Sequence, residues 1–174
     1  NGVAILSKVP FAASTIHHRC GKEDCRHIEV ALDVGSDPIL LDNLYIPAGG
    51  DIPDPDLNVK FAHKLDFYRE MAAWYAERKP GPRARKGLRR ITVGDLNVAP
   101  LEHDVWSHKQ LLKIVSHTPV EVELFGRLQA SLDWIDVPRK FVPESEKLYS
   151  WWSYRNNDWR VSNRGRRLDH ILAS

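Results

Sequence analysis

Two short apolar runs, each with an aspartate at one end, constrain the fold of this chain more than any other feature. Residues 91–93 (Ile-Thr-Val) lead into residues 94–97 (Gly-Asp-Leu-Asn), and residues 168–173 (Leu-Asp-His-Ile-Leu-Ala) contain the second acid. Short runs of aliphatic and β-branched side chains are typical of buried strands. The pattern therefore places Asp95 and Asp169 near strand ends, where α/β proteins usually build their sites.

The other apolar runs predict a fold in which strands outnumber helices. Loops are expected over residues 11–27 and 156–165. Further strands are expected over residues 3–6, 28–32, 39–46, 134–137 and 149–154. Because adjacent β-prone runs favour antiparallel pairing, the predicted fold class is an α/β or α+β layered sandwich. The length suits one domain over residues 1–174.

Two helices are expected between these strands. In residues 59–78 apolar side chains recur every three or four positions, which predicts a helix with its Lys, Glu and Arg side chains on the other face. The apolar stripe consists of Phe61, Leu65, Tyr68, Ala72 and Tyr75. Residues 121–131 predict the second helix by the same criterion.

Basic residues are concentrated toward the end of the chain. The net charge is only +2, but residues 139–174 contain eight Lys and Arg against four Asp and Glu. The same region holds Trp151, Trp152 and Trp159, and basic side chains interleaved with aromatic ones suit phosphate backbones and unstacked bases. On this feature alone a solvated basic face above core tryptophans is the favoured interpretation, and the basic run at residues 83–90 is interpreted as a solvated connector. No stretch is long and apolar enough to span a membrane.

Residues 17–27 hold both cysteines, Cys20 and Cys25, together with three histidines. Zinc binding, a disulfide and a reduced surface loop all stay open for such a segment. Because the spacing matches no standard zinc motif, and because Gly, Asp and Lys suit a solvent-exposed loop, the reduced loop is the favoured interpretation.

Asp95 and Asn97 suit the hydrolysis of a phosphodiester. They lie two residues apart, so they project to the same side if the strand continues through them. A hard cation such as Mg²⁺ is held by carboxylates and waters, and a carboxamide beside a carboxylate can orient an attacking water. Gly94 would allow a sharp turn and a close approach to a substrate. Gly and Asp are also ordinary turn residues, so a purely structural turn is the alternative.

Asp169 and Tyr45 are further candidates. Asp169 is flanked by Leu168 and by residues 171–172 (Ile-Leu), so it is expected to be partly buried and to need a partner. A catalytic histidine held by an aspartate is a common use of such a group. His170 is not that partner, because neighbours in a strand face opposite sides. Tyr45 ends a strand, where its hydroxyl could donate to a phosphate oxygen or simply be satisfied at the core boundary.

Taken in order, these segments resemble the exonuclease III family of abasic-site endonucleases, within the endonuclease/exonuclease/phosphatase superfamily. The resemblance covers nearly the whole chain, and several motifs in the same order make it specific. It rests on residues 1–8 (Asn-Gly-Val-Ala-Ile-Leu-Ser-Lys), 43–47 (Asn-Leu-Tyr-Ile-Pro), 60–68, 94–100 (Gly-Asp-Leu-Asn-Val-Ala-Pro), 149–155 (Tyr-Ser-Trp-Trp-Ser-Tyr-Arg) and 163–169 (Asn-Arg-Gly-Arg-Arg-Leu-Asp).

The resemblance implies a four-layer α/β sandwich and Mg²⁺- or Mn²⁺-dependent cleavage of duplex DNA. The implied activities are incision on the 5′ side of abasic sites, 3′-to-5′ exonuclease action and removal of 3′ blocking groups. Asp95 would bind the metal together with Asn97 and activate the water, and Asn97 would also orient the water and the phosphate. Asp169 would hold the catalytic histidine, and Tyr45 would contact the scissile phosphate.

The resemblance also implies substrate contacts. Trp151 and Trp152 would line the pocket for a flipped-out abasic sugar, which leaves the stack cheaply because it carries no base. Arg26, just before a strand, would reach a phosphate, and Arg155 and Arg166 would bind the DNA backbone. The protein is expected to act as a monomer on abasic sites and 3′ ends, in the cytoplasm with the nucleoid.

The chain departs from the family pattern at its ends and at two internal positions. The family's metal-binding Glu falls before Asn1, and its catalytic His, in a Ser-Asp-His motif, falls after Ser174. The chain is therefore expected to be a fragment lacking both ends, inactive alone and prone to aggregate through exposed sheet edges. Residues 48–50 (Ala-Gly-Gly) replace the Asn or Gln that follows Tyr-x-Pro in many members. Arg166 replaces a Trp found in some members, which makes the pocket wall more polar.

Two alternatives to a DNA-repair phosphodiesterase stay open. One is a phosphohydrolase of the same superfamily that acts on another phosphodiester or phosphoester. The other is a DNA-binding relative without catalysis.

Overall fold

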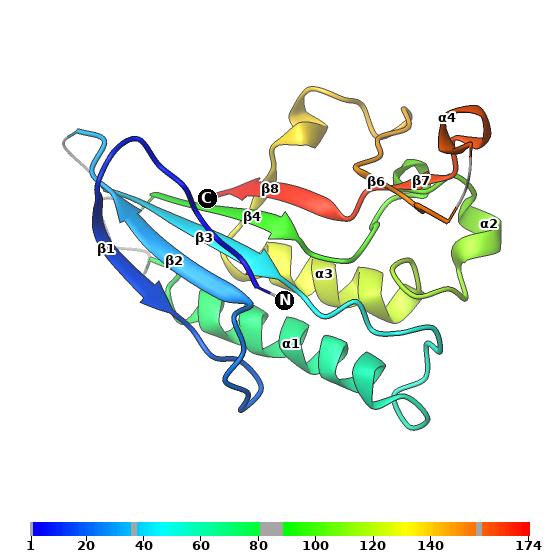
Figure 1. Cartoon of the computed structure of the whole chain (residues 1–174), viewed down its shortest axis with the longest axis horizontal. Coiled ribbons are helices and arrows are strands. Elements are labelled where there is room, and N and C mark those ends of the chain that lie inside the picture. The colour runs from blue at the N-terminus through cyan, green and yellow to red at the C-terminus, as the bar shows by residue number, and fades with distance from the viewer. Residues whose placement is uncertain (1, 36–37, 81–88, 156–157) are drawn as a thin grey trace.

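One mixed sheet of six strands, with two long helices on one face, forms the body of the protein (Figure 1). The computed structural model describes residues 2–35, 38–80, 89–155 and 158–174. The strand order is β1-β2-β3-β4-β8-β5, with β1 Phe11–Ile16, β2 His27–Leu32, β3 Ile39–Tyr45, β4 Arg89–Asp95, β5 Ile135–Asp136 and β8 Asp169–Ala173. The long helices are α1 Val59–Ala76 and α3 Pro119–Ser131.

Short elements complete the fold. A second sheet consists of β6 Trp151–Trp152 and β7 Gly165–Arg166, and it lies beyond the end of β4 with α2 and α4 nearby (Figure 1). The short helices are α2 His108–Leu111 and α4 Trp159–Ser162, and the 3₁₀ turns are Glu102–Asp104 and Pro138–Lys140. The predicted mixed α/β class is confirmed.

Pairing within the large sheet is antiparallel except between its two central strands. β1–β2, β2–β3, β4–β8 and β5–β8 are antiparallel, whereas β3 and β4 run parallel. A parallel pair needs a crossover connection, and α1 provides it between β3 and β4. As a result β3 and β4 finish at the same edge of the sheet.

The helix predicted over residues 59–78 is confirmed as α1. Its first turn is capped by Asn58, whose side chain accepts from the Lys60 N–H over 3.0 Å. The apolar stripe packs on the sheet and on α3, with Phe61, Tyr68 and Tyr75 fully buried. Lys64 is also fully buried, so the prediction that every charged side chain of this helix lies on the outer face was wrong.

The strand predicted over residues 3–6 was wrong. This segment is irregular and touches the sheet through Val3 N–H, which donates to the Cys25 carbonyl over 3.0 Å. The first strand is instead Phe11–Ile16, within a segment predicted as loop. All six residues of this edge strand are exposed, so it is held by main-chain pairing with β2 and carries no apolar pattern. The polar loop predicted over residues 156–165 likewise contains α4.

Three further features of the sequence can be placed. Within the described residues, no helix combines the length and the apolar character that crossing a membrane requires. Cys20 and Cys25 carry free thiols. Among all the residues that the structure describes, no group of three or more His, Cys, Asp or Glu side chains is arranged to hold a metal. Asn1 and the basic run up to position 88 lie outside the described residues.

Candidate active site

Tyr45, Asp95 and Asp169 lie in a row across one end of the sheet. Tyr45 at the end of β3 is paired with Asp95 at the end of β4, and Asp95 is paired with Asp169 at the start of β8. Directly opposed residues project from the same face, with Cβ atoms about 5 Å apart in an antiparallel pair. The sheet therefore brings these three side chains together at strand ends.

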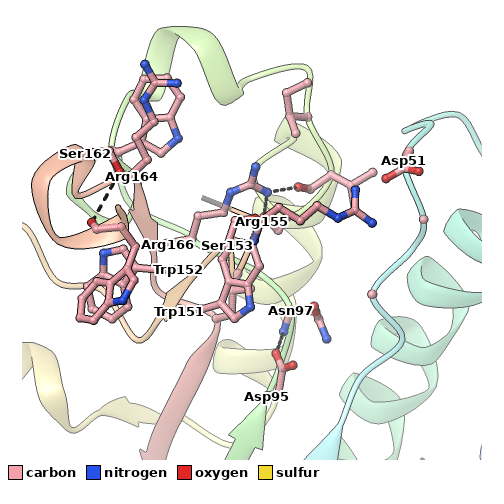
Figure 2. Close-up of a pocket in the computed structure, with 18 of the residues that line it drawn as sticks. Asp51, Asp95, Asn97, Trp151, Trp152, Ser153, Arg155, Ser162, Arg164 and Arg166 are labelled. Carbon is pink, nitrogen blue, oxygen red and sulfur yellow. Dashed lines mark hydrogen bonds between the residues drawn. The ribbon is translucent and has the colours of Figure 1, made fainter. Parts of the chain in front are cut away.

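Asn97 joins the row through a turn and not through a continuing strand. β4 ends at Asp95, and Asn97 has a left-handed backbone with φ 53°. Its main-chain N–H donates to Asp95 Oδ1 over 2.9 Å (Figure 2), and its Nδ2 donates to the Ile46 carbonyl over 2.8 Å. The premise that the two side chains share a strand face was wrong, although both line one cleft. Since the amide nitrogen is bound to the main chain, the amide oxygen is the end available to a ligand.

Gly94 is required by the close packing of β4 on β3. With φ at 129°, a Cβ at this position would lie 2.0 Å from the Leu44 carbonyl oxygen. No side chain fits there, because the clash is with rigid main chain. The close approach that this glycine permits is to the neighbouring strand, and it sets the path of the chain into Asp95.

The Asp95 carboxyl has a pKa well above the usual value for an aspartate. Burial, together with the negative charge of Asp169, raises the pKa of Asp95 to about 6, while the hydrogen bond from Asn97 and the charge of Lys64 lower it. Asp169 itself is exposed, so the expectation that it would be partly buried was wrong. The reason is that Asp169 lies on the sheet face opposite to His170, and the helices cover the His170 face.

Ionisation of Asp95 is expected to destabilise the fold as the pH rises. The pKa of Asp95 is about 6 in the folded chain, against about 3.9 for an aspartate in an unfolded chain, so the folded state binds the proton more tightly. The free energy of unfolding should therefore fall as the pH rises from about 4 to about 6, by roughly 1–2 kcal/mol after allowance for solvent screening. Urea unfolding of the wild type and of Asp95→Asn, near both ends of that range, measures the effect. An equal pH dependence in the two proteins would contradict it.

A buried ion pair holds the two loops that follow β3 and β4. Lys64 Nζ donates to the Asn97 carbonyl over 2.6 Å and to the Ala48 carbonyl over 3.3 Å, and it pairs with the Glu121 carboxylate of α3. Glu121 also accepts from the Ser116 N–H over 2.9 Å. Both charged side chains are fully buried. The pair therefore ties α1 and α3 to the turn that carries Asn97.

Sequence reasoning missed this pair, although each member carried a signal. Lys64 lies on the apolar stripe, three residues after Phe61 and four before Tyr68, where a lysine indicates a buried partner. Glu121 lies three residues after Thr118, which is the spacing of a capping box, and the structure contains that box. The link between them joins different helices, so no local pattern could predict it.

A cleft of about 1040 Å³ opens beside Asp95 and Asn97 (Figure 2). Its walls are largely aromatic and basic, because β6, β7 and the loop after α4 all contribute Trp or Arg side chains. The predicted site residues on the walls are Tyr45, Trp151, Trp152, Arg155 and Arg166, and the walls also include Trp106, Trp159 and Arg164. Trp106 and Arg164 were not predicted; the Arg164 guanidinium lies 4.7 Å from the centre of the Trp106 ring.

Arg26 lies behind Tyr45 and is not among the residues that line the cleft. Its guanidinium is 4.9 Å from the centre of the Tyr45 ring, and its Nη1 donates to the Tyr45 carbonyl over 3.2 Å. It also pairs with Asp24 over 2.8 Å. These contacts brace Tyr45, so the structure gives Arg26 a supporting position next to the cleft.

His170 faces away from Asp169, as the strand geometry predicted. It is buried against Phe125, its Nε2 hydrogen-bonds to the Val98 carbonyl over 2.8 Å, and burial lowers its pKa to about 4. Within the described residues, no histidine is hydrogen-bonded to the Asp169 carboxylate.

The donors at the end of the sheet fit a hard divalent cation. Asp95 and the Asn97 oxygen are oxygen donors, and burial, with a smaller contribution from the negative charge of Asp169, raises the pKa of Asp95. A cation bound at Asp95 would offset both the burial of this carboxylate and the nearby charge of Asp169. Mg²⁺ commonly uses only one or two carboxylates and completes its shell with waters and phosphate oxygens, so a larger cluster is not required.

Comparisons with known proteins agree with this geometry. Residues 1–174 match the endonuclease/exonuclease/phosphatase family. Exodeoxyribonuclease III of Haemophilus influenzae is 28% identical over 181 residues, covering 99% of this chain and 64% of that protein. The DNA repair nuclease APEX1 of Danio rerio is 33% identical over 111 residues, covering 64% of this chain and 34% of that protein.

Solved structures show the same fold. The 3′-5′ exonuclease NExo from Neisseria meningitidis has a TM-score of 0.78 at 20% identity, covering 97% of this chain and 60% of its own. The AP endonuclease from Archaeoglobus fulgidus has a TM-score of 0.72 at 23% identity, covering 95% of this chain and 56% of its own. The matches thus span less than two thirds of each of these relatives. Since the family match extends over the whole chain, this protein belongs to the endonuclease/exonuclease/phosphatase family.

Proposed function

We propose that this chain is part of a divalent-metal-dependent DNA-repair nuclease. Its substrates would be abasic sites and 3′ ends in duplex DNA, cut by abasic-site incision and 3′-to-5′ exonuclease action. The observation that carries the proposal is the row of Tyr45, Asp95 and Asp169, continued by Asn97, beside an aromatic and basic cleft. Relatives named exodeoxyribonuclease III and DNA repair nuclease support this substrate.

Asp95 is assigned to the metal and to the attacking water. A bound Mg²⁺ or Mn²⁺ would neutralise charge on the phosphoryl oxygens and lower the pKa of a coordinated water. Asp95 and the Asn97 oxygen would hold the cation, and the Asp95 carboxylate would accept a hydrogen bond from the water. The buried Asn97 side chain is fixed by the Ile46 carbonyl, so it orients the water without reorganising.

The neighbouring residues are assigned by position. Tyr45, braced by Arg26, would donate its hydroxyl to an oxygen of the scissile phosphate. Asp169, exposed beside Asp95, would accept a hydrogen bond from the catalytic histidine that the family places elsewhere in its sequence. These two roles rest on the family resemblance and on the shared row.

The aromatic wall is assigned to the displaced nucleotide. Trp151 and Trp152 would contact an abasic sugar, and Arg155, which is exposed at the cleft, would bind the DNA backbone. Basic contacts of this kind make binding weaken as salt increases. The monomeric state and the cytoplasmic location with the nucleoid stay predictions.

Metal removal tests the proposed function. Two substrates are used: a duplex with one abasic site and a duplex with a recessed 3′ end. Each is incubated separately with the complete protein and with this 174-residue chain. We expect cleavage by the complete protein in Mg²⁺ or Mn²⁺ and none in chelator, because phosphoryl charge is then no longer neutralised. Tight duplex binding without cleavage in any metal would indicate the DNA-binding relative instead.

A further inference from the structure

Residues 17–26, which join β1 to β2, carry histidines and cysteines that the candidate site does not use. This segment is fastened to α1, because the Cys20 N–H donates to the Glu70 carboxylate over 2.6 Å. Arg19 is only 5% exposed, and its guanidinium lies 4.6 Å from the centre of the Trp74 ring of α1. The segment is thus closed against α1 by a buried arginine.

Arg19 donates hydrogen bonds to a buried histidine. Its Nη2 lies 2.9 Å and its Nε 3.3 Å from Nδ1 of His27, the first residue of β2. On the other side of the ring, Nε2 lies 2.9 Å from Asp42 Oδ1. Because a guanidinium has no acceptor, Nδ1 is the unprotonated nitrogen, and Nε2 carries the hydrogen that Asp42 accepts. The closed segment therefore requires a neutral His27.

Charged and titratable groups from every element around His27 act on this ring. Burial lowers the pKa of His27, the hydrogen bond and the charge of Asp42 raise it, and the charge of Arg19 lowers it, with a net decrease. Asp42 is itself shared with Arg90, which also pairs with Glu29. The groups are His17 and Arg19 of the segment, Glu29 on β2, Asp42 on β3, Glu70 and Tyr75 on α1, Arg78 just after α1, and Arg90 on β4.

A second proton on His27 is incompatible with the present position of Arg19. It would lie on Nδ1, so that donors would face donors and two positive charges would meet in a buried site. Asp42 holds the ring through Nε2 and attracts its charge, so the group expected to move is Arg19. The Glu70 side chain is 39% exposed and lies 3.6 Å from Arg19 Nη1, so the guanidinium can move toward solvent and keep this carboxylate.

The far end of the segment supports Tyr45 beside the cleft. Arg26 immediately precedes His27, and its carbonyl accepts from the Tyr45 N–H over 2.9 Å while its guanidinium lies 4.9 Å from the centre of the Tyr45 ring. The His17 N–H donates to the His27 carbonyl over 3.0 Å, so the two ends of the segment are paired beside the histidine ring. Movement of the segment is therefore transmitted to Arg26.

We propose that His27 is a pH switch for the 17–26 segment. While neutral, it holds Arg19 and keeps the segment closed on α1; once protonated, it releases Arg19, opens the segment and loosens the support that Arg26 gives to Tyr45. The switch goes beyond the proposed function, since it requires neither DNA nor a metal.

The direction of the pH dependence follows from the burial of the neutral ring. His27 has a lower pKa in the closed form than in the open form, so acid favours the open form. The ordinary pKa of a histidine is about 6.5, and each pH unit below it should increase the open population by up to about 10-fold, until the closed form is itself protonated. Above that range the segment should stay closed.

Amide hydrogen exchange of the complete protein, followed by NMR at pH about 7.5 and about 5, tests the switch. Dividing the exchange rates of unstructured peptides by the measured rates gives protection factors that report opening alone. The reporters are the N–H groups of Cys20, Lys22 and Tyr45, which donate to Glu70, Arg19 and Arg26. In wild type their protection should fall by at least about 10-fold between the two pH values.

His27→Gln is the decisive variant. Its amide nitrogen can donate to Asp42 and its amide oxygen can accept from Arg19, but the side chain does not titrate. Protection in this variant should change by less than about two-fold between the two pH values. His18→Gln is the matched control, because it removes an exposed histidine of the same segment and should leave the wild-type response intact.

Arg19→Met provides a second test if His27→Gln does not fold, which thermal unfolding of each variant will show. It should leave the segment open at both pH values, because nothing then joins the segment to His27. An equal loss of protection in wild type and His27→Gln would overturn the inference, as would wild-type protection in Arg19→Met at both pH values. A Tyr45 N–H that stays protected while the segment opens would overturn it too. Cleavage assays judge the proposed function separately, since these measurements use no DNA and no metal.

Discussion

Replacing Lys64 with methionine is expected to lower the free energy of unfolding by about 3–5 kcal/mol, because it leaves the Glu121 carboxylate buried and unpaired. The Asn97 and Ala48 carbonyls lose their ammonium donor at the same time. Domains are stable by only about 5–15 kcal/mol, so this change should be visible as a large shift of the urea unfolding midpoint.

A double-mutant cycle separates the pair from general damage to α1. Combining Lys64→Met with Glu121→Gln should recover at least about 1 kcal/mol, since the uncompensated charge is then gone. Arg127→Met is the matched control, because it breaks an ion pair with Glu123 in which both side chains are about two-thirds exposed; it should cost less than about 1 kcal/mol. If Lys64→Met were no more damaging than this control, the pair would not hold the site.

In the complete protein, replacing Asp95 with alanine is expected to lower the rate of DNA cleavage by about 10³-fold, on the proposed function. The variant removes the central carboxylate of the row and the acceptor for the Asn97 N–H. The free energy of unfolding near neutral pH should not fall comparably, because burial and the Asp169 charge already disfavour this carboxylate. Single-turnover cleavage of an abasic-site duplex, with urea unfolding alongside, measures both quantities.

Two variants make the Asp95 result specific. Asp95→Asn keeps the size and an acceptor for the Asn97 N–H but removes the negative charge, so it should be nearly as slow as alanine. Asp56→Asn removes an exposed carboxylate outside the cleft and should leave the rate within about two-fold. A rate for Asp95→Ala above about a tenth of wild type would show that the row is not the catalytic centre.

The sequence predicted the layered α/β class, the helices and the strand ends because these depend on local periodicity. The runs at β2, β3, β4 and β8 alternate or cluster their apolar side chains, and such runs can be recognised as strands before their partners are known. The same reasoning failed for β1 Phe11–Ile16, because an exposed edge strand is stabilised by main-chain hydrogen bonds that any sequence can make. It failed for Asn97 because a left-handed turn interrupts the alternation of a strand.

Some features of the candidate site could likewise be predicted from the sequence, and others could not. By itself the sequence determined which residue types were available and that Tyr45, Asp95 and Asp169 lay at strand ends. Tertiary structure alone decided that β3 and β4 run parallel and align these residues, that Asp169 is exposed, and that Lys64 meets a glutamate 57 positions away. It also decided that Arg167 meets carboxylates while Arg166 faces the cleft. The physical reason is that burial and pairing energies depend on which face of a strand is covered and by what, and long-range contacts set that.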